Sequence, residues 1–467
     1  MKTFATLIFC AMPLSCQSNS GDLHLKVIDP FGAGVKATVH ILSEANQYRA
    51  ILQSGEQGDL EVQRLPYGNY RIDVEKPSFA RFIETVQIRS SLPTERLMQL
   101  KVPTANQTVV VNSASTLIDP EQAGSVSQIG SEFLQKRLSS IPGRSLQDVV
   151  NSQPGWLYEG NAVLHPRGSE YQTQFVVDGI PLTDNRSPGF GPEIEADDLQ
   201  SMSIYTAGIP AEYGRKMGGV IEVNTIQDTQ SGLHGKVVLS GGSYSTAGAF
   251  TKGQYTWGRN TLSGSASGNR TDHYLNPVVV QNYSNTGTLG DWSGRYQRDL
   301  TANDRVSLTV RRELSRYDLP NEQLQQAAGQ RQTADNIETM GIASYVHTVS
   351  SHALADFRGL VRDNTKDFNS NAESTPIEVF QNNRFREGYF RGTVTAVTGR
   401  HEWKVGVESD NTFLQENLNY SVTDPTQFNE GTPLTFAFRS QRPDVEQSAF
   451  VQDLVQMGQW TINAGLR

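Results

Sequence analysis

Hydrophobic and polar residues alternate with a period of two from residue 233 onward. The apolar positions of two representative runs are Val306, Leu308 and Val310, and Trp403, Val405 and Val407, with polar residues or glycine between them. A period of two places alternate side chains on opposite faces of a β-strand. The spacing of such runs and of the turn residues between them predicts about eleven antiparallel strands between residues 233 and 467.

The connections between these strands differ in length on the two sides of the predicted sheet. Short turns are expected near 258–260, 350–351, 399–400 and 458–459, and long polar connections near 270–287, 313–336, 364–384 and 413–445. Short connections on one side and long ones on the other are typical of a transmembrane β-barrel, although a soluble sandwich can share the alternation. Trp257, Trp403 and Trp460 fall near the short turns, where a barrel has an aromatic girdle.

The last alternating run, from Trp460 to Arg467, reaches the end of the sequence without a turn signal. Barrels wide enough to hold an internal domain have about 22 strands. We therefore expect residues 233–467 to be the N-terminal part of a transmembrane antiparallel β-barrel, incomplete as given, with about eleven more strands following.

Two smaller units precede the barrel. Residues 22–100 contain short alternating runs separated by turn clusters such as Pro66-Tyr67-Gly68-Asn69, which predicts a small β-sandwich. Residues 130–227 begin with a helical stretch around Leu146 that ends at Pro154-Gly155, and strand-like runs follow. This order predicts an α+β domain, and the whole chain is expected to be mainly β.

The first twenty residues predict an export signal. Lys2 is followed by an apolar segment and then by small residues, so the mature chain is expected outside the cytoplasm. Both cysteines, Cys10 and Cys16, lie in this segment. Cys16 could be lipidated, but Pro13 stands where lipoprotein signals usually have leucine, and ordinary cleavage nearby is the alternative.

Composition excludes several function classes. The net charge is −9, from 40 basic and 49 acidic residues, so no basic footprint for nucleic acid is present. The eight histidines show no metal-ligand spacing, and no nucleophile elbow or phosphate loop occurs in the required context. We expect neither an enzyme nor a cofactor.

Residues 130–227 carry a series of motifs in a fixed order. After the helix and Pro-Gly come His165-Pro166-Arg167-Gly168, then Val177-Asp178-Gly179-Ile180-Pro181, then Ala211-Glu212-Tyr213-Gly214-Arg215, and finally Gly218-Gly219-Val220-Ile221. This series resembles the plug domain of TonB-dependent outer-membrane receptors, with Pro166 departing from the usual apolar residue. Within residues 22–100, the order Gly34-Val35-Lys36-Ala37-Thr38-Val39, then Gly58-Asp59-Leu60, then Leu65-Pro66-Tyr67-Gly68-Asn69-Tyr70 resembles the carboxypeptidase regulatory-like domain. The resemblance implies a folded spacer, with a partner-binding or glycan-binding role as the alternative.

The plug resemblance implies a role for the linker at 101–129. Its run Thr108-Val109-Val110-Val111-Asn112 resembles a TonB box, which would pair as an added strand with TonB, the protein that energises these receptors. The alternative is a last strand of the small β-domain.

The resemblance also implies roles for individual plug residues. Arg167 and Arg215 would pair with carboxylates facing the barrel lumen, or would simply be solvated there. The loops containing Tyr158 and Asn161, and Asn185, Arg186 and Phe190, would face outward and contact ligand.

The function implied is uptake of a scarce external ligand by a TonB-dependent receptor in the outer membrane. TonB with its inner-membrane complex, membrane lipid and a small ligand would be its partners. The ligand could be a siderophore, cobalamin, a glycan or a peptide. An adhesin or scaffold built on the same plug and barrel is the alternative.

Overall fold

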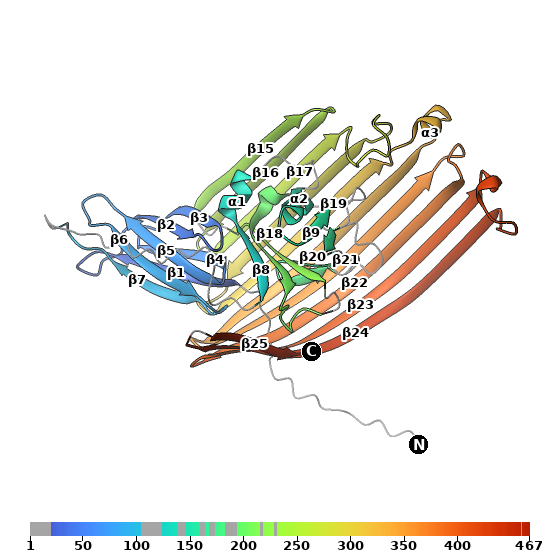
Figure 1. Cartoon of the computed structure of the whole chain (residues 1–467). Helices are drawn as coiled ribbons and strands as arrows, with labels where there is room; N and C mark the ends of the chain where they lie inside the picture. The colour runs from blue at the N-terminus through green and yellow to red at the C-terminus, as the bar shows by residue number, and fades with distance from the viewer. Residues whose placement is uncertain are drawn as a thin grey trace, which may run out of the picture.

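The computed structural model describes residues 20–103, 124–137, 145–158, 164–167, 173–182, 194–214, 218–227, 231–458 and 460–467. These residues form a small β-domain, a plug domain and a large curved sheet (Figure 1). The plug lies within the curve of the sheet, and the β-domain lies beside one end of the sheet's strands. No described helix is long and apolar enough to cross a membrane.

The β-domain consists of two sheets that share one core. Its strands are β1 (Ser20–Ile28), β2 (Thr38–Ser43), β3 (Tyr48–Gln53), β4 (Asp59–Pro66), β5 (Gly68–Glu75), β6 (Phe82–Ile88) and β7 (Thr94–Gln99). They pair in the orders β4-β1-β7 and β3-β2-β5-β6. Alternate residues of both sheets, including Leu23, Ile41 and Ile72, are fully buried in one cluster, so the predicted two-faced strands do form a sandwich.

The plug combines a five-stranded sheet with short helices. Its elements are β8 (Ser125–Gly130), α1 (Ser131–Lys136), α2 (Ser145–Asn151), β9 (Trp156–Tyr158), β10 (Leu164–Pro166), β11 (Thr173–Val177), β12 (Ile180–Leu182), η1 (Ala196–Asp198), β13 (Leu199–Ala207) and β14 (Gly219–Thr225). The sheet order is β12-β11-β14-β13-β8. Pro166 takes part in the β9–β10 pairing opposite Trp156.

The large sheet contains eleven antiparallel strands in chain order. They are β15 (Gly232–Gly242), β16 (Thr246–Trp257), β17 (Asn260–Thr271), β18 (Gly287–Asp299), β19 (Asp304–Asp318), β20 (Gln332–Ser350), β21 (Ala353–Ser370), β22 (Ile377–Thr398), β23 (His401–Val422), β24 (Thr435–Met457) and β25 (Trp460–Leu466). Within the described residues β15 and β25 each pair with one neighbour, so the sheet is open (Figure 1). This architecture confirms the predicted fold class.

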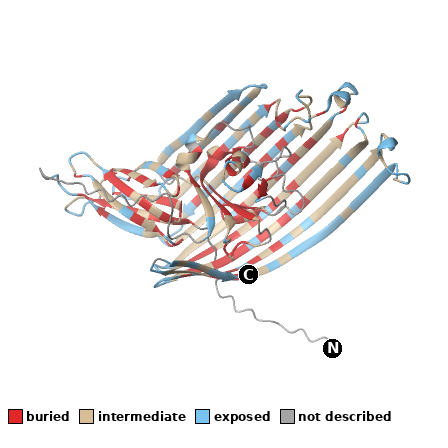
Figure 2. Ribbon diagram, in the orientation of Figure 1, coloured by how far each residue is buried: buried red, intermediate tan, exposed pale blue. Residues whose placement is uncertain are grey.

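The faces of the sheet are reversed relative to those of a soluble protein. On β23, Trp403 and Val405 are exposed, whereas Lys404 between them is 2% exposed. The buried positions concentrate where the sheet faces the plug (Figure 2). An apolar outer face and a polar inner face are the arrangement of a membrane barrel wall, as the alternation predicted.

The long connection predicted near 270–287 is confirmed as 272–286, whereas the other three are shorter than predicted. Much of the expected connection at 413–445 is strand, because β23 continues to Val422 and β24 begins at Thr435. The connection expected at 364–384 shrinks to 371–376, and the helix α3 (Gln323–Ala327) occupies part of another. The polar composition of these segments predicted loops. They form strands instead, because their backbone N–H and C=O groups pair with those of the neighbouring strands, and this pairing does not depend on the side chains. The predicted short turns fall between consecutive strands, and 243–245 and 300–303 are two further short connections, the first of them on the side where long connections were expected.

The plug and the sheet share a hydrophobic core. Buried plug residues such as Val150 and Ile221 belong to the same cluster as Met340, Ile342, Leu360 and Tyr389 of the sheet. The β-domain cluster has no member from either of these parts. The plug is therefore packed as part of the barrel interior, whereas the β-domain has a separate core.

Candidate functional site

The Asp178-Gly179 turn between β11 and β12 presses the plug against the sheet. Both residues have positive φ, +50° and +78°, in a two-residue hairpin turn. Asp-Gly is a favoured pair for such turns, because each residue must adopt a left-handed backbone. The local sequence therefore places a carboxylate at the tip of a rigid hairpin.

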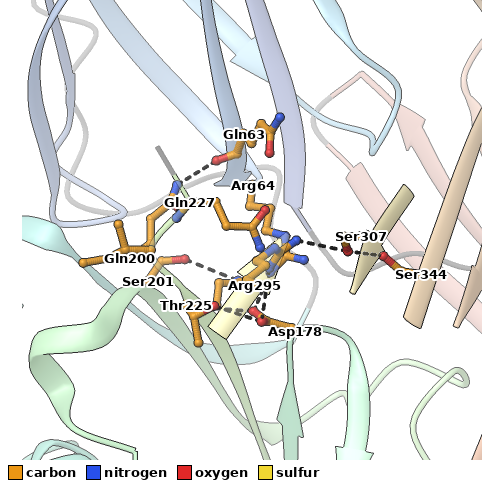
Figure 3. A network of polar contacts seen from close by, with 12 residues as sticks. Gln63, Arg64, Asp178, Gln200, Ser201, Thr225, Gln227, Arg295, Ser307 and Ser344 are labelled. Atoms are coloured by element: carbon orange, nitrogen blue, oxygen red, sulfur yellow. Dashed lines mark hydrogen bonds and ion pairs between the residues drawn. The ribbon is translucent and has the colours of Figure 1, made fainter. Parts of the chain in front are cut away.

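Three hydrogen-bond donors and one further cation, from three parts of the chain, surround the Asp178 carboxylate (Figure 3). The backbone N–H and the hydroxyl of Thr225 donate to it over 3.0 and 2.9 Å, within the plug. Arg64 of the β-domain forms an ion pair with it, and Nη1 of Arg295 on β18 lies 3.6 Å away. Burial alone raises the pKa of Asp178, but Arg64, Arg295 and Thr225 outweigh burial and lower the pKa to about 2.

The backbone of the same turn contacts two more arginines of the sheet. The guanidinium of Arg358 on β21 donates to the carbonyl of Asp178, and Nη1 of Arg391 on β22 lies 3.4 Å from the carbonyl oxygen of Gly179. A Cβ at position 179 would lie 2.0 Å from Nη1 of Arg358. Glycine suits this position by its φ, and a Cβ here would displace the end of the Arg358 side chain.

A second contact joins the plug to the sheet at Glu212, in the turn before β14. Its carboxylate accepts hydrogen bonds from Nη2 of Arg391 at 2.9 Å and from Nζ of Lys404 at 2.7 Å. The three side chains are 2% exposed or less. Arg467 donates to the carbonyl of Glu212 at 2.9 Å. Such charge-assisted bonds in a dry site hold the plug in one orientation.

Glu222 on β14 is a third buried carboxyl of the plug. Burial, reinforced by the charge of Glu212, raises its pKa to about 7, although Lys404 and Tyr213 act in the opposite direction. The two glutamates are therefore not equivalent, because Glu212 has two cations in direct contact while Glu222 tends to hold a proton.

A further set of plug carboxylates contacts the first strands of the sheet. Asp197 accepts from Lys236 on β15 at 2.6 Å, and Asp198 accepts from Lys252 on β16 at 2.6 Å. Arg311 on β19 lies 3.9 Å from Asp198. Carboxylates of the plug thus face cations of the wall along the width of the sheet.

For Arg167, the described residues fit the second of its two predicted roles, a solvated side chain, rather than a pair with a carboxylate. That guanidinium is exposed and donates to Thr206 Oγ1 of the plug at 3.3 Å, and no described carboxylate pairs with it. Its backbone N–H bonds to the carbonyl of Gly155 at 2.7 Å, and its φ is +50°, so the residue shapes a turn. The charges of the plug motif do not show which residues of the sheet carry the opposite charge. Sequence analysis missed the wall cations, such as Arg391 and Lys404. Their positions on the polar face of the predicted strands could have indicated them.

The remaining plug-motif residues have structural roles. Pro181 lies on β12, Tyr213 is buried with its ring 5.7 Å from that of Tyr205, and Gly214 leaves no room for a Cβ beside Arg467. Gly219 lies beneath the Trp156 ring, and Gly218 precedes it at the start of β14. Among the proposed ligand-contact residues, only Tyr158 is described, as the last residue of β9.

Several predicted residues lie outside the described residues. They are Cys10 and Cys16 of the export signal, Thr108, Val109, Val110, Val111 and Asn112 of the TonB box, Gly168 and Arg215 of the plug motifs, and Asn161, Asn185, Arg186 and Phe190 of the ligand-contact loops. Their roles remain predictions.

One cluster was not anticipated from the spacing of the histidines. Asp22, His24 and Glu61 offer ligand atoms within 4.8 Å of one another. Asp22 and His24 are two apart on one face of β1, and His24 is paired with Glu61 across the sheet. Arg305 already pairs with both carboxylates, at 3.0 Å for Asp22, so the cluster forms a salt-bridged contact with β19.

Comparison with known proteins agrees with this geometry. The family model described as TonB-dependent Receptor Plug Domain matches residues 120–220. The TonB-dependent transporter Oar of Myxococcus xanthus is 25% identical over 191 residues, which cover 39% of this chain and 18% of Oar. The resemblance of residues 22–100 to a carboxypeptidase regulatory-like domain gains no support from these matches and remains a prediction.

Solved structures share the fold. The unliganded ferric citrate transporter FecA aligns with a TM-score of 0.59 and 16% identity, over 74% of this chain and 56% of FecA. The siderophore receptor PiuA of Acinetobacter baumannii aligns with a TM-score of 0.52 and 12% identity, over 72% of this chain and 56% of PiuA. The chain thus spans about half the length of these structures and less than a fifth of Oar. Residues 120–220 therefore match the plug-domain family of TonB-dependent receptors, and the described residues share the fold of the solved FecA and PiuA structures.

Proposed function

We propose that this chain takes up a scarce external ligand across the bacterial outer membrane, with energy supplied through TonB. The observation that carries the proposal is the seating of the plug. Its core is continuous with Met340, Ile342 and Leu360 of the wall, and Glu212 is bound by two wall cations. A plug held by both apolar and charged contacts closes the passage, so uptake needs work to move it.

TonB is the proposed source of that work. The run 108–112 precedes the plug and has the β-prone character needed for strand addition to a partner's sheet. Backbone hydrogen bonds provide most of the affinity in this mode, so loss of a single backbone N–H should matter more than a change of side chain.

For the ligand, we propose a small metal chelate as the first class to test. FecA and PiuA, a ferric citrate transporter and a siderophore receptor, have the same fold, and the predicted ligand-contact segments 158–161 and 185–190 carry polar and aromatic residues. Cobalamin, glycans and peptides are the other classes to include.

The test compares binding and uptake in cells that express the full-length receptor. Probes are radiolabelled ferric citrate, ferric enterobactin and cyanocobalamin. Val110→Pro should abolish uptake of the active probe while binding to intact cells stays within about twofold of wild type. Val110→Ala, which keeps the N–H, should leave both unchanged. Equal loss of binding and uptake in Val110→Pro would refute the TonB-box assignment. A wild-type receptor that takes up no probe, in a strain whose deletion shows no nutrient-limited growth defect, would refute the function.

A further inference from the structure

We propose that the β-domain, residues 20–103, is a releasable latch on the plug. Residues 63 and 64 of β4 dock at the junction of plug and wall and help to hold the Asp178-Gly179 turn in place. The last step of the inference, that the latch must leave before the plug can move, rests on the proposed uptake function.

The latch is built by a β-bulge. Between the pairs Leu23↔Val62 and Gly21↔Leu65, β4 contains one residue more than β1, so Gln63 and Arg64 both oppose Asp22. Arg64 has φ +56°, and its N–H donates to the Asp22 carboxylate at 3.0 Å. A bulge with a left-handed residue turns a side chain away from its regular direction. Here it directs Arg64 out of the β-domain and into the plug.

The bulge contacts the plug and the wall together (Figure 3). Arg64 pairs with Asp178, and its side chain is only 15% exposed. The carbonyl of Gln63 accepts from the Gln200 side chain of the plug at 2.7 Å, and its amide oxygen accepts from Gln297 of β18 at 3.3 Å. Two successive residues thus join three parts of the molecule.

Further contacts lie along the same end of the sheet, where the short turns are. Arg305, directly after the 300–303 turn, pairs with Asp22 and Glu61. Tyr67 donates to Glu402 at the start of β23 over 3.2 Å. The β-domain therefore covers the short-turn end of the sheet, beside the plug (Figure 1).

The character of this interface allows release. The plug shares an apolar cluster with the wall, but the β-domain cluster is separate from it. Between the β-domain and the wall lies a cavity of about 270 Å³, lined among others by Asp22, Arg64, Arg295 and Asp356. Polar interfaces between domains are typical of parts that move relative to one another.

Release would change the plug directly. Asp178 is buried against two guanidinium side chains, Arg64 and Arg295, and undocking removes the first. A buried carboxylate that loses a cation is less stable in its place, so domain release and loosening of the turn are coupled.

The test measures docking without ligand or TonB. Ser344 on β20 lines the cavity, and a cysteine there is nearly isosteric with serine. The two cysteines of the sequence lie in the predicted export signal, so Ser344→Cys provides a single reporter thiol after cleavage of that signal. The labelling is done in isolated outer membranes that contain the full-length receptor. The thiol at position 344 should react slowly with a maleimide that is too bulky to enter the cavity. Adding Arg64→Ala should accelerate labelling roughly tenfold or more. Lys26→Ala, which removes an exposed ion pair of the same domain, should leave the rate unchanged.

Hydrogen exchange separates undocking from unfolding. The amides of the buried β-domain residues Val39 and Ile72 should stay protected in Arg64→Ala. Equal labelling rates with and without Arg64→Ala would overturn the latch. Faster labelling that occurs only when the amides of Val39 and Ile72 lose protection would also overturn it, because the domain would then have unfolded rather than undocked.

A second arm tests the step that depends on function. In cells with TonB, Ser344→Cys should be labelled faster when the inner membrane is energised than after addition of a protonophore. No difference would overturn the claim that energised transport releases the latch, while the Arg64 arm and the uptake assay report separately on docking and on transport.

Discussion

Glu212 is the residue on which the seating of the plug depends most directly. Its carboxylate is fully buried between Arg391 and Lys404. Glu212→Gln would remove the carboxylate charge that both cations contact, although Arg391 keeps its ion pair with Glu408 at 3.3 Å. Removing one partner of a buried ion pair costs about 3 to 5 kcal/mol in comparable cases. Hydrogen exchange of the β13 and β14 amides in the full-length receptor should report this loss. Glu430→Gln, in an exposed connection, is the control and should change nothing. Unchanged exchange in Glu212→Gln would show that apolar packing alone seats the plug.

Glu222 gives the plug a pH dependence of opposite sign to that of an ordinary salt-bridged acid. Its folded pKa, about 7, exceeds the ordinary 4.5, so between these values the folded state holds a proton that the unfolded state has released. Plug stability should therefore fall as pH rises from about 4.5 to 7, by at most about 3.4 kcal/mol at 1.36 kcal/mol per pKa unit. Glu222→Gln should flatten this part of the profile of plug hydrogen exchange. A variant profile parallel to that of wild type would contradict the assignment.

At the scale of elements, the β11–β12 hairpin is the rigid contact between plug and wall. Gly179→Ala should destabilise the plug, since Cβ costs about 1 to 2 kcal/mol at positive φ and also collides with Arg358. Gly399→Ala is a matched control with φ +61° and no neighbour within 4 Å of its Cβ, so it should show the φ cost alone. Thermal unfolding of both variants measures the difference. Equal losses would mean that Arg358 moves aside freely.

At the scale of the whole molecule, the division of the cores predicts which parts fold alone. Residues 20–103 contain a complete cluster of their own, so this fragment should unfold cooperatively on heating. Residues 130–227 share their core with Met340, Ile342, Leu360 and Tyr389 of the wall, so the isolated plug should show at most weak order and no cooperative transition. Calorimetry of the two fragments tests this. A cooperative transition of the plug alone would show that the wall is dispensable for its fold.

The sequence by itself determined the elements whose cause is local. A period of two defines a strand with one apolar face, and the Asp178-Gly179 pair defines a tight turn, because backbone geometry depends on adjacent residues. The eleven strands, the short turns and the plug hairpin were therefore predictable. The order of the plug motifs also identified the family that residues 120–220 match.

Only the tertiary structure decided how these elements meet. Arg64 and Asp178 are far apart in the sequence, as are Glu212 and Lys404, and nothing in either neighbourhood specifies the partner. The sequence could not decide between a paired and a solvated Arg167 for the same reason, because pairing depends on which strand faces the plug and in which register. The polar ends of β23 and β24 became strand because the neighbouring backbone supplied hydrogen-bond partners. Such contacts form only in the assembled fold. Because buried charges are poorly screened by water, the electrostatic energy of each one depends on the charges that lie beside it in space.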